Sequence, residues 1–153
     1  MSERNEGSLQ EYVTATIGSQ LFGLPIRRVQ DVFMPERVTR VPLAPPEIAG
    51  VLNMRGRIVT LVDLRRRLGL PDRTENGPVM AIGVESRGES YGLLIDAVGE
   101  VLKLDIEARE ANPVNLDPEL ARVSAGIHRL DGQLLMALDV DRLLDIGPRA
   151  AAA

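Results

Sequence analysis

Two halves of the chain resemble each other, and this internal duplication constrains the fold more than any other feature of the sequence. Phe22-Gly23-Leu24 matches Tyr91-Gly92-Leu93, 69 positions further along. A second match, 76 positions apart, aligns the segment from Ala49 to Leu68 with the segment from Ala125 to Leu144. Two matches in the same order indicate two pseudo-equivalent β subdomains, each of about 60–70 residues, that share an apolar seam.

Short apolar runs broken by turn residues predict strands in both halves, as in a β-barrel or sandwich. Arg87-Gly88 and Asp131-Gly132 stand where hairpin turns are expected. Two short helices are expected after Asp63 and Asp139, because an aspartate can cap the first free N–H groups of a helix. The predicted strands are Tyr12–Ile17, Gln20–Pro25, Gly50–Met54, Ile58–Val62, Val79–Val84, Tyr91–Ile95, Gly99–Leu104, Ser124–Leu130 and Gln133–Leu138.

The chain of 153 residues has the usual size of one domain. We expect a domain over residues 11–146, between a flexible polar tail (residues 1–10) and a flexible Ala-rich tail (residues 147–153) in which Gly147 closes the second helix. The N-terminus lacks the apolar stretch of a secretory signal, and no apolar run approaches the roughly 20 residues that cross a bilayer. Because the chain also has no cysteine, the simplest interpretation is a cytosolic protein without membrane insertion.

The net charge of −4 argues against nucleic-acid binding, which needs a basic face. The basic run Arg65-Arg66-Arg67 is interpreted as the solvated face of the first short helix. Catalysis finds no support, because the single histidine, His128, falls inside a predicted strand and no cysteine is present. Carboxylates alone remain as metal ligands, and Asp63 and Asp139 are better explained as helix caps. We therefore expect a binding module without catalytic residues, metal or cofactor.

One turn differs between the two halves. Met54-Arg55-Gly56 corresponds to Leu130-Asp131-Gly132 in the second match. Asp-Gly suits a hairpin turn, whereas an arginine brings no advantage to one. Two interpretations of Arg55 stay open at this point, a contact residue and a solvated turn charge.

The run from Gly50 to Arg65, Gly-Val-Leu-Asn-Met-Arg-Gly-Arg-Ile-Val-Thr-Leu-Val-Asp-Leu-Arg, resembles the hallmark of the chemotaxis coupling-protein (CheW) family. That hallmark is Gly-Val-x-Asn-x-Arg-Gly followed by an aliphatic strand and Val-Asp-Leu-Arg. In the second half, the segment from Tyr91 to Val98 resembles the family's Gly-x-x-Val-Asp-x-Val, and the resemblance extends from about Glu11 to Ile146. It implies an all-β fold with short helices, built as two interlocked five-stranded β-barrels of SH3-like or OB-like type.

The resemblance also implies a role as an adaptor. Members of the family couple the cytoplasmic tips of methyl-accepting chemoreceptors to the regulatory domain of the histidine kinase CheA, and they have neither catalytic residues nor a cofactor. The chain would then act in the cytoplasm at membrane receptor arrays. We expect a monomer or weak associator that can join ring-like assemblies with the kinase's regulatory domain.

The same resemblance implies a set of partner-binding residues. Arg55 matches the arginine implicated in receptor-dependent control of the kinase, within the turn Asn53-Met54-Arg55-Gly56. Asp31 stands where many relatives carry the longer glutamate. Gly50 matches a glycine at which a side chain would disturb the groove or the barrel, and Val98 and Met80 fall where the receptor-binding groove is expected. The full set is Val29, Asp31, Gly50, Asn53, Met54, Arg55, Gly56, Met80 and Val98.

Alternatives to this interpretation stay open on the sequence. A core position explains Val29, Val98 and Met80 as well as partner contact does. The chain could instead be the regulatory domain of the kinase, or a coupling protein of a non-chemotaxis pathway that controls motility or second-messenger output. An oligonucleotide-binding barrel is a third class, which the acidic balance and the few aromatic residues disfavour.

Overall fold

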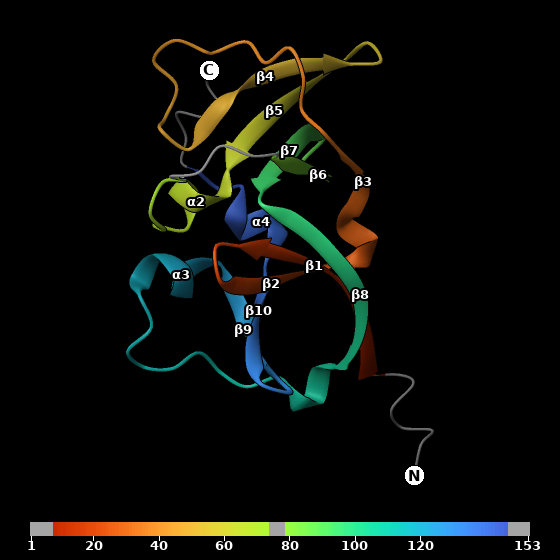
Figure 1. The fold of residues 1–153 in the computed structure, drawn as a ribbon, viewed down its shortest axis with the longest axis vertical. Helices are drawn as coiled ribbons and strands as arrows, with labels where there is room; N and C mark the ends of the chain where they lie inside the picture. Colours follow the sequence, from red (N-terminus) through yellow and green to blue (C-terminus); the bar gives the residue numbers. More distant parts are fainter. Residues whose placement is uncertain (1–7, 74–78, 147–153) are drawn as a thin grey trace.

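The computed structural model describes residues 8–73 and 79–146, which fold into ten strands, three short α-helices and two 3₁₀-helices. Two five-stranded sheets form the molecule, one above the other in Figure 1. Sheet A has the order β8-β1-β2-β10-β9 and sheet B the order β3-β6-β7-β5-β4. The elements are β1 (Leu9–Ile17), β2 (Gln20–Pro25), η1 (Ile26–Arg28), β3 (Val29–Phe33), β4 (Ile48–Met54), β5 (Arg57–Asp63), α2 (Leu64–Arg67), β6 (Met80–Ser86), β7 (Glu89–Ile95), β8 (Ala97–Asp105), η2 (Ile106–Ala108), α3 (Pro118–Val123), β9 (Ser124–Leu130), β10 (Gln133–Leu138) and α4 (Val140–Leu143).

The two sheets are not the two sequence halves. The hairpin β1–β2 of the first half pairs with β8 and β10 of the second, while β6–β7 of the second half pairs with β3 and β5 of the first. The two pseudo-equivalent units are therefore not the two contiguous halves of the chain, and the interlocked arrangement implied by the family resemblance is confirmed. One physical cause is the single residue, Asp96, between β7 and β8. Because a tight hairpin needs about two loop residues, the chain passes straight on into the other sheet.

The residues that pair across the two parallel strand pairs are related by the duplication found in the sequence. In the parallel pair β2–β10, Gly23 lies opposite Ala137. In the parallel pair β5–β7, Gly92 lies opposite Leu61. These positions are separated by the same 69 and 76 residues that align the two halves. The pseudo-equivalence of the two sheets is thus confirmed residue by residue.

The sheets are open rather than closed barrels. Within the described residues, edge strand β3 does not pair with β4, and β8 does not pair with β9. The outer edge of β4 instead forms one bridge, from Val51 to Thr39 in the segment after β3, and β9 forms the equivalent bridge from Ile127 to Glu110. The expectation of closed barrels is corrected accordingly, because these connecting segments take the place that the other edge strand would need.

One apolar core joins the two sheets. It includes Phe22 and Leu24 from β2, Leu93 from β7, and Leu64 and Leu143 from the two helices α2 and α4, all fully buried. In Figure 1, α2 and α4 lie at the level where the sheets meet. This core is the apolar seam expected from the sequence.

All nine predicted strands are present, with bounds that differ by at most a few residues, and the hairpin turns lie where they were expected. Asp63 caps α2 through the N–H groups of Arg65 and Arg66, and Asp139 caps α4 through that of Arg142. β1 begins at Leu9, inside the predicted N-terminal tail. Residues 1–7, the Ala-rich tail and Gly147 lie outside the described residues.

Candidate functional site

The predicted site residues fall into two groups, and the first is the tip of the β4–β5 hairpin. Met54 pairs with Arg57, so Arg55 and Gly56 form a two-residue loop. Their φ angles, 55° and 82°, are those of a type I′ turn. The Asn53 side chain supports the turn, since its Oδ1 accepts a hydrogen bond from the Gly56 N–H at 2.9 Å. The left-handed conformation favours glycine or asparagine, so Arg55 is held in it at an energetic cost.

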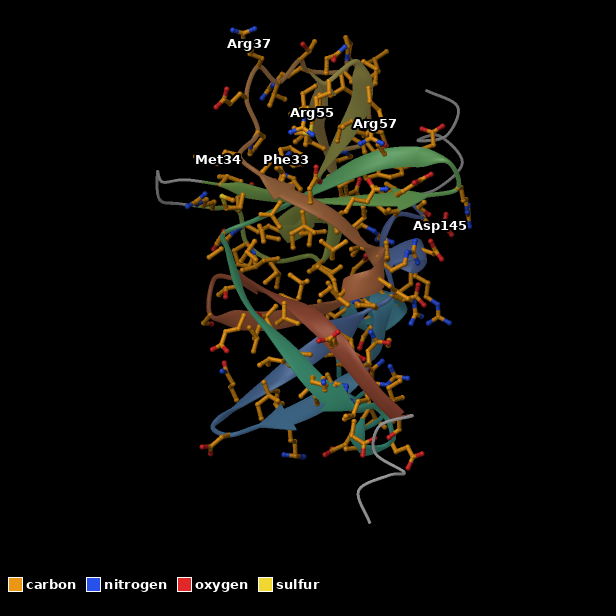
Figure 2. All side chains as sticks on the ribbon, turned by 90° about the vertical axis from the view of Figure 1, so that its right-hand side faces the viewer. Phe33, Met34, Arg37, Arg55, Arg57 and Asp145 are labelled. Atoms are coloured by element: carbon orange, nitrogen blue, oxygen red, sulfur yellow. The ribbon has the colours of Figure 1, made fainter. Side chains whose placement is uncertain are left out.

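Exposed cationic and apolar side chains meet at this end of sheet B. Figure 2 shows Arg55 and Arg57 on the hairpin, with Arg37 beyond them and Phe33 and Met34 below. Met34 is 57% exposed and Ile58, next to Arg57, is 59% exposed. Apolar contact area bordered by arginines is the composition typical of a protein-binding surface.

Gly50 lies buried at the base of the same hairpin and has no part in its exposed surface. Its φ of 153° lies outside the range that residues with a side chain favour. A Cβ at this position would lie 2.6 Å from the Thr39 carbonyl oxygen. Thr39 and Val51 exchange two backbone hydrogen bonds of 2.8 Å here. A side chain at Gly50 would therefore push the segment after β3 off the edge of β4.

The second group lies where the two sheets meet, on the edge strands β3 and β8 and, for Met80, on β6 beside β3. Val29 on β3 pairs with Val84, and its counterpart in the duplication, Val98 on β8, pairs with Ala15. Both strands lie on the face turned to the viewer in Figure 2. Val29, Val98 and Met80 are half-buried and pack against the main core. They lie at the margin of the core, and part of each side chain is accessible. A core position and contact with a partner are therefore both compatible with the structure for these three residues.

Asp31, two residues beyond Val29, is exposed on β3 opposite Gly83 of β6. Its side chain lies across Gly83, where a Cβ would overlap the Asp31 Oδ1 atom. Gly83 was not singled out in the sequence, and only the tertiary register reveals the contact.

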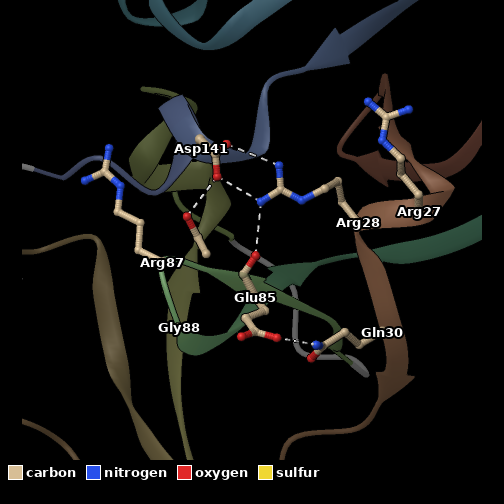
Figure 3. A pocket seen from close by; sticks show the side chains of 8 residues that line it. Arg27, Arg28, Gln30, Glu85, Arg87, Gly88 and Asp141 are labelled. Carbon is tan, nitrogen blue, oxygen red and sulfur yellow. Dashed lines mark hydrogen bonds and ion pairs between the residues drawn. The ribbon is translucent and has the colours of Figure 1, made fainter.

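A polar cavity of about 500 Å³ opens beside the start of β3, where η1, the β6–β7 turn and α4 meet (Figure 3). At its centre the Arg28 guanidinium donates to Asp141 Oδ1 at 2.8 Å and to the Glu85 carbonyl at 3.0 Å. The hydrogen bond to Asp141 raises the pKa of Arg28, and the same bond lowers the pKa of the Asp141 carboxyl. The lining residues are Arg27, Arg28, Gln30, Glu85, Ser86, Arg87, Gly88 and Asp141.

A second ion pair joins the sheets, between Arg65 of α2 and Asp96 at 2.8 Å. Asp96 Oδ2 also accepts the Gly18 N–H of the β1–β2 turn at 2.8 Å. Burial alone would raise the pKa of Asp96, but the Gly18 hydrogen bond and Arg65 outweigh it and lower the pKa. The carboxylate therefore stays ionised and connects the two sheets.

Arg67 is buried, so the interpretation of the basic run as a solvated face is wrong for this residue. Its guanidinium donates to the Leu143 carbonyl at 2.7 Å, to the Arg142 carbonyl at 2.9 Å and to the Asp145 carbonyl at 3.3 Å. These carbonyls lie at the end of α4, where a helix leaves its acceptors free. The sequence held a signal for this position, because the 76-residue match aligns Arg67 with the buried Leu143.

No constellation for catalysis stands out in the part of the chain that the structure describes. His128 is buried, with its ring in an edge-to-face contact with Tyr12, and burial lowers its pKa. The nearby Ser124 hydroxyl donates to Asn112 Oδ1 at 2.7 Å. In residues 8–73 and 79–146, no three His, Cys, Asp or Glu side chains gather as metal ligands would, and none of the helices is long and apolar enough to span a bilayer.

Comparisons with known proteins agree on one family. The family model described as CheW-like domain matches residues 11–147. The chemotaxis protein CheW of Klebsiella aerogenes is 28% identical over 135 residues, which cover 88% of this chain and 81% of that protein. The chemotaxis protein CheW of Helicobacter pylori is 29% identical over 146 residues, or 93% of this chain and 85% of that protein.

A solved structure shares the fold. The crystal structure of the scaffolding protein TtCheW from Thermoanaerobacter tengcongensis superimposes with a TM-score of 0.80 at 28% sequence identity. The match covers 90% of this chain and 89% of that protein. The interlocked sheets described above are thus an arrangement that this chain shares with an experimentally determined scaffold.

Proposed function

The chain belongs to the CheW-like domain family, and on that premise we propose that it is a non-enzymatic chemotaxis adaptor. It couples the cytoplasmic tips of methyl-accepting chemoreceptors to the histidine kinase CheA. The relatives that carry the name chemotaxis protein CheW, and the related scaffolding protein, support this role. Its place of action is the cytoplasm, at membrane receptor arrays.

The observation that carries the proposal is the conformation of Arg55. An exposed arginine occupies a left-handed turn position, with φ 55°, whereas Asp131 at the equivalent position of the other half does not have a positive φ. The Arg55 side chain forms no hydrogen bond or ion pair with any residue that the structure describes, so the fold does not explain why an arginine stands there. Contact with a partner does explain it, because an arginine is among the residues that contribute most to protein interfaces.

An adaptor acts by binding two partners at once, and the chain offers two surfaces for this. The hairpin tip presents Arg55 and exposed apolar side chains at one end of sheet B. The edge strands β3 and β8 present Val29 and Val98 where the sheets meet. In our proposal an apolar face of a receptor helix lies along these edge strands, and polar groups at the rim fix its register.

The test is receptor-coupled autophosphorylation of the kinase CheA, measured with receptor membranes from the source organism. Adding the wild-type chain should raise kinase activity, and attractant should then suppress it. Arg55→Ala should stimulate poorly although it folds, whereas Arg87→Ala, which changes an exposed arginine in another hairpin turn, should stimulate as well as the wild type.

An unchanged kinase activity with every receptor and kinase of the organism would refute the chemotaxis role. The fold would then point to a coupling protein of a motility or second-messenger pathway. A fluorescent fusion spread evenly through the cytoplasm would refute the association with receptor arrays.

A further inference from the structure

Asp31 carries an exposed carboxylate that has no charged partner among the described residues. β3 and β6 run antiparallel with an irregularity between Val29 and Asp31, after which Asp31 lies opposite Gly83. The Asp31 side chain lies over Gly83, where a Cβ would overlap its Oδ1 atom. Among the described residues, this carboxylate has no hydrogen bond and no ion pair.

The equivalent place in sheet A is built differently. Thr14 stands where sheet B has Gly83, and Glu100 stands where it has Asp31. The buried Thr14 hydroxyl donates to the Glu100 backbone carbonyl at 2.7 Å. In sheet A, a side-chain hydrogen bond therefore spans the register shift between β1 and β8. At the register shift between β3 and β6 in sheet B, Gly83 lies under the exposed Asp31 carboxylate instead. The framework itself therefore does not require the glycine and aspartate of sheet B.

A carboxylate on an exposed strand usually exchanges between rotamers, and a partner that binds it must restrict that motion. A side chain at position 83 would push the Asp31 carboxylate out of the place it takes here. The neighbour Val29 is apolar and half-accessible, as is its counterpart Val98 on β8. An apolar strip bordered by one negative charge fits a helix whose apolar face is bordered by a lysine or arginine.

We propose that Gly83 is a positioning residue that lets the Asp31 carboxylate lie where it meets a basic side chain of the chemoreceptor's cytoplasmic tip. This inference rests on the adaptor function proposed above. Gly83 does not touch the partner, and it acts only by leaving room for the Asp31 side chain.

The test is the affinity of the purified cytoplasmic fragment of the receptor for four forms of the full chain. These are the wild type, Asp31→Asn, Gly83→Ala and the double variant. Each single change should weaken binding about fivefold to tenfold, which is the usual effect of losing one well-placed charge pair. The double variant should bind no more weakly than Asp31→Asn alone, because the two residues act through one carboxylate. Raising the salt concentration should weaken the wild type more than Asp31→Asn.

Thr14→Val is the matched control. It removes the internal hydrogen bond of the equivalent irregularity in sheet A, so it should lower the urea midpoint and leave receptor affinity unchanged. A stability measurement separates positioning from a structural need for glycine. Because the displaced atom is the end of an exposed side chain, Gly83→Ala should leave the urea midpoint close to that of the wild type, whereas a large fall would indicate a structural need for glycine and overturn the proposal.

Three further results would overturn the proposal while the adaptor function stands. They are a folded Gly83→Ala chain that binds the receptor normally, losses that multiply in the double variant, and a loss confined to binding of the kinase's regulatory domain. If the wild-type chain binds no receptor and stimulates no kinase, the adaptor function itself fails.

Discussion

Replacing Arg55 with asparagine should stabilise the chain and at the same time weaken its proposed function. Arg55 and Gly56 are the two central residues of a type I′ turn, with φ angles of 55° and 82°. Asparagine adopts the left-handed region more readily than arginine, because its short side chain can hydrogen-bond locally. Arg55→Asn therefore relieves strain in the turn and removes the guanidinium that we propose contacts a partner.

The magnitude follows from the turn geometry. A left-handed conformation costs an ordinary residue about 1–2 kcal/mol, and asparagine recovers part of this cost. Since the Arg55 side chain has no hydrogen bond or ion pair to lose among the described residues, the free energy of unfolding should rise by about 0.5–1 kcal/mol. That corresponds to a rise in Tm of about 1–4 °C for a domain of this size. Loss of a central arginine from an interface should weaken binding by at least about tenfold.

The β6–β7 hairpin contains a matched control. Arg87 and Gly88 have φ angles of 53° and 80°, and Ser86 pairs with Glu89 across the same two-residue loop. Arg87→Asn should bring a similar gain in stability and leave kinase stimulation intact. The assays are urea denaturation and receptor-coupled autophosphorylation. Two results would refute the reasoning: a loss of stability in both variants, or full kinase stimulation by Arg55→Asn.

Three further predictions concern the framework. Arg67→Ala should lower the free energy of unfolding by about 3–5 kcal/mol in urea denaturation, because it leaves buried carbonyls of α4 without their charged donor, whereas Arg66→Ala, whose side chain is half-exposed, should cost less than about 1 kcal/mol. Gly50→Ala should lower the free energy of unfolding by about 3 kcal/mol, because alanine is strained at this positive φ and its Cβ would overlap the Thr39 carbonyl; a wild-type urea midpoint would contradict this. Since burial lowers the pKa of His128, the unfolded chain binds the extra proton, so stability should be fully present above about pH 6.5, fall as the pH drops below that value, and level off below the folded-state pKa; His128→Phe should remove this slope.

The strands could be predicted from the sequence wherever local chemistry marks their ends. β2, β9 and β10 have the predicted bounds, because turn residues flank each apolar run. β3 was missed since an edge strand exposes both of its faces, which leaves no alternation of apolar and polar residues to read. The helix α3 was also missed, although Asp117 as N-cap followed by Pro118 is a usual start signal.

The candidate site was predictable only in part, for a similar reason. Arg55 could be singled out because the duplication supplies a comparison, Asp131, inside the same chain. The roles of Gly83 and Arg67 depend on atoms far away in the sequence, on Asp31 and on the end of α4. No local pattern encodes such contacts. The comparison of the two halves did not predict the exchange of hairpins between the sheets either, because strand pairing across the halves also depends on contacts between distant residues.

The duplication also separates charges that serve the framework from charges that face a partner. Asp141 corresponds to Arg65 in the 76-residue match, and Arg28 lies one residue beyond the counterpart of Asp96, so the two ion pairs that join the sheets have opposite polarity. At a given distance and dielectric the attraction depends on the product of the two charges, so reversing the polarity of a pair does not by itself change how it stabilises the junction.

An exposed turn charge behaves differently, because its counter-charge belongs to another molecule. Arg55 and Asp131 occupy equivalent turns at the ends of sheets B and A, with opposite signs. Like charges across an interface cost free energy where opposite charges gain it, so a partner complementary to one end is repelled at the other. The two ends share a backbone framework but are not interchangeable as binding surfaces, and this asymmetry is what a two-fold repeated chain needs if it is to hold two different partners in a fixed order.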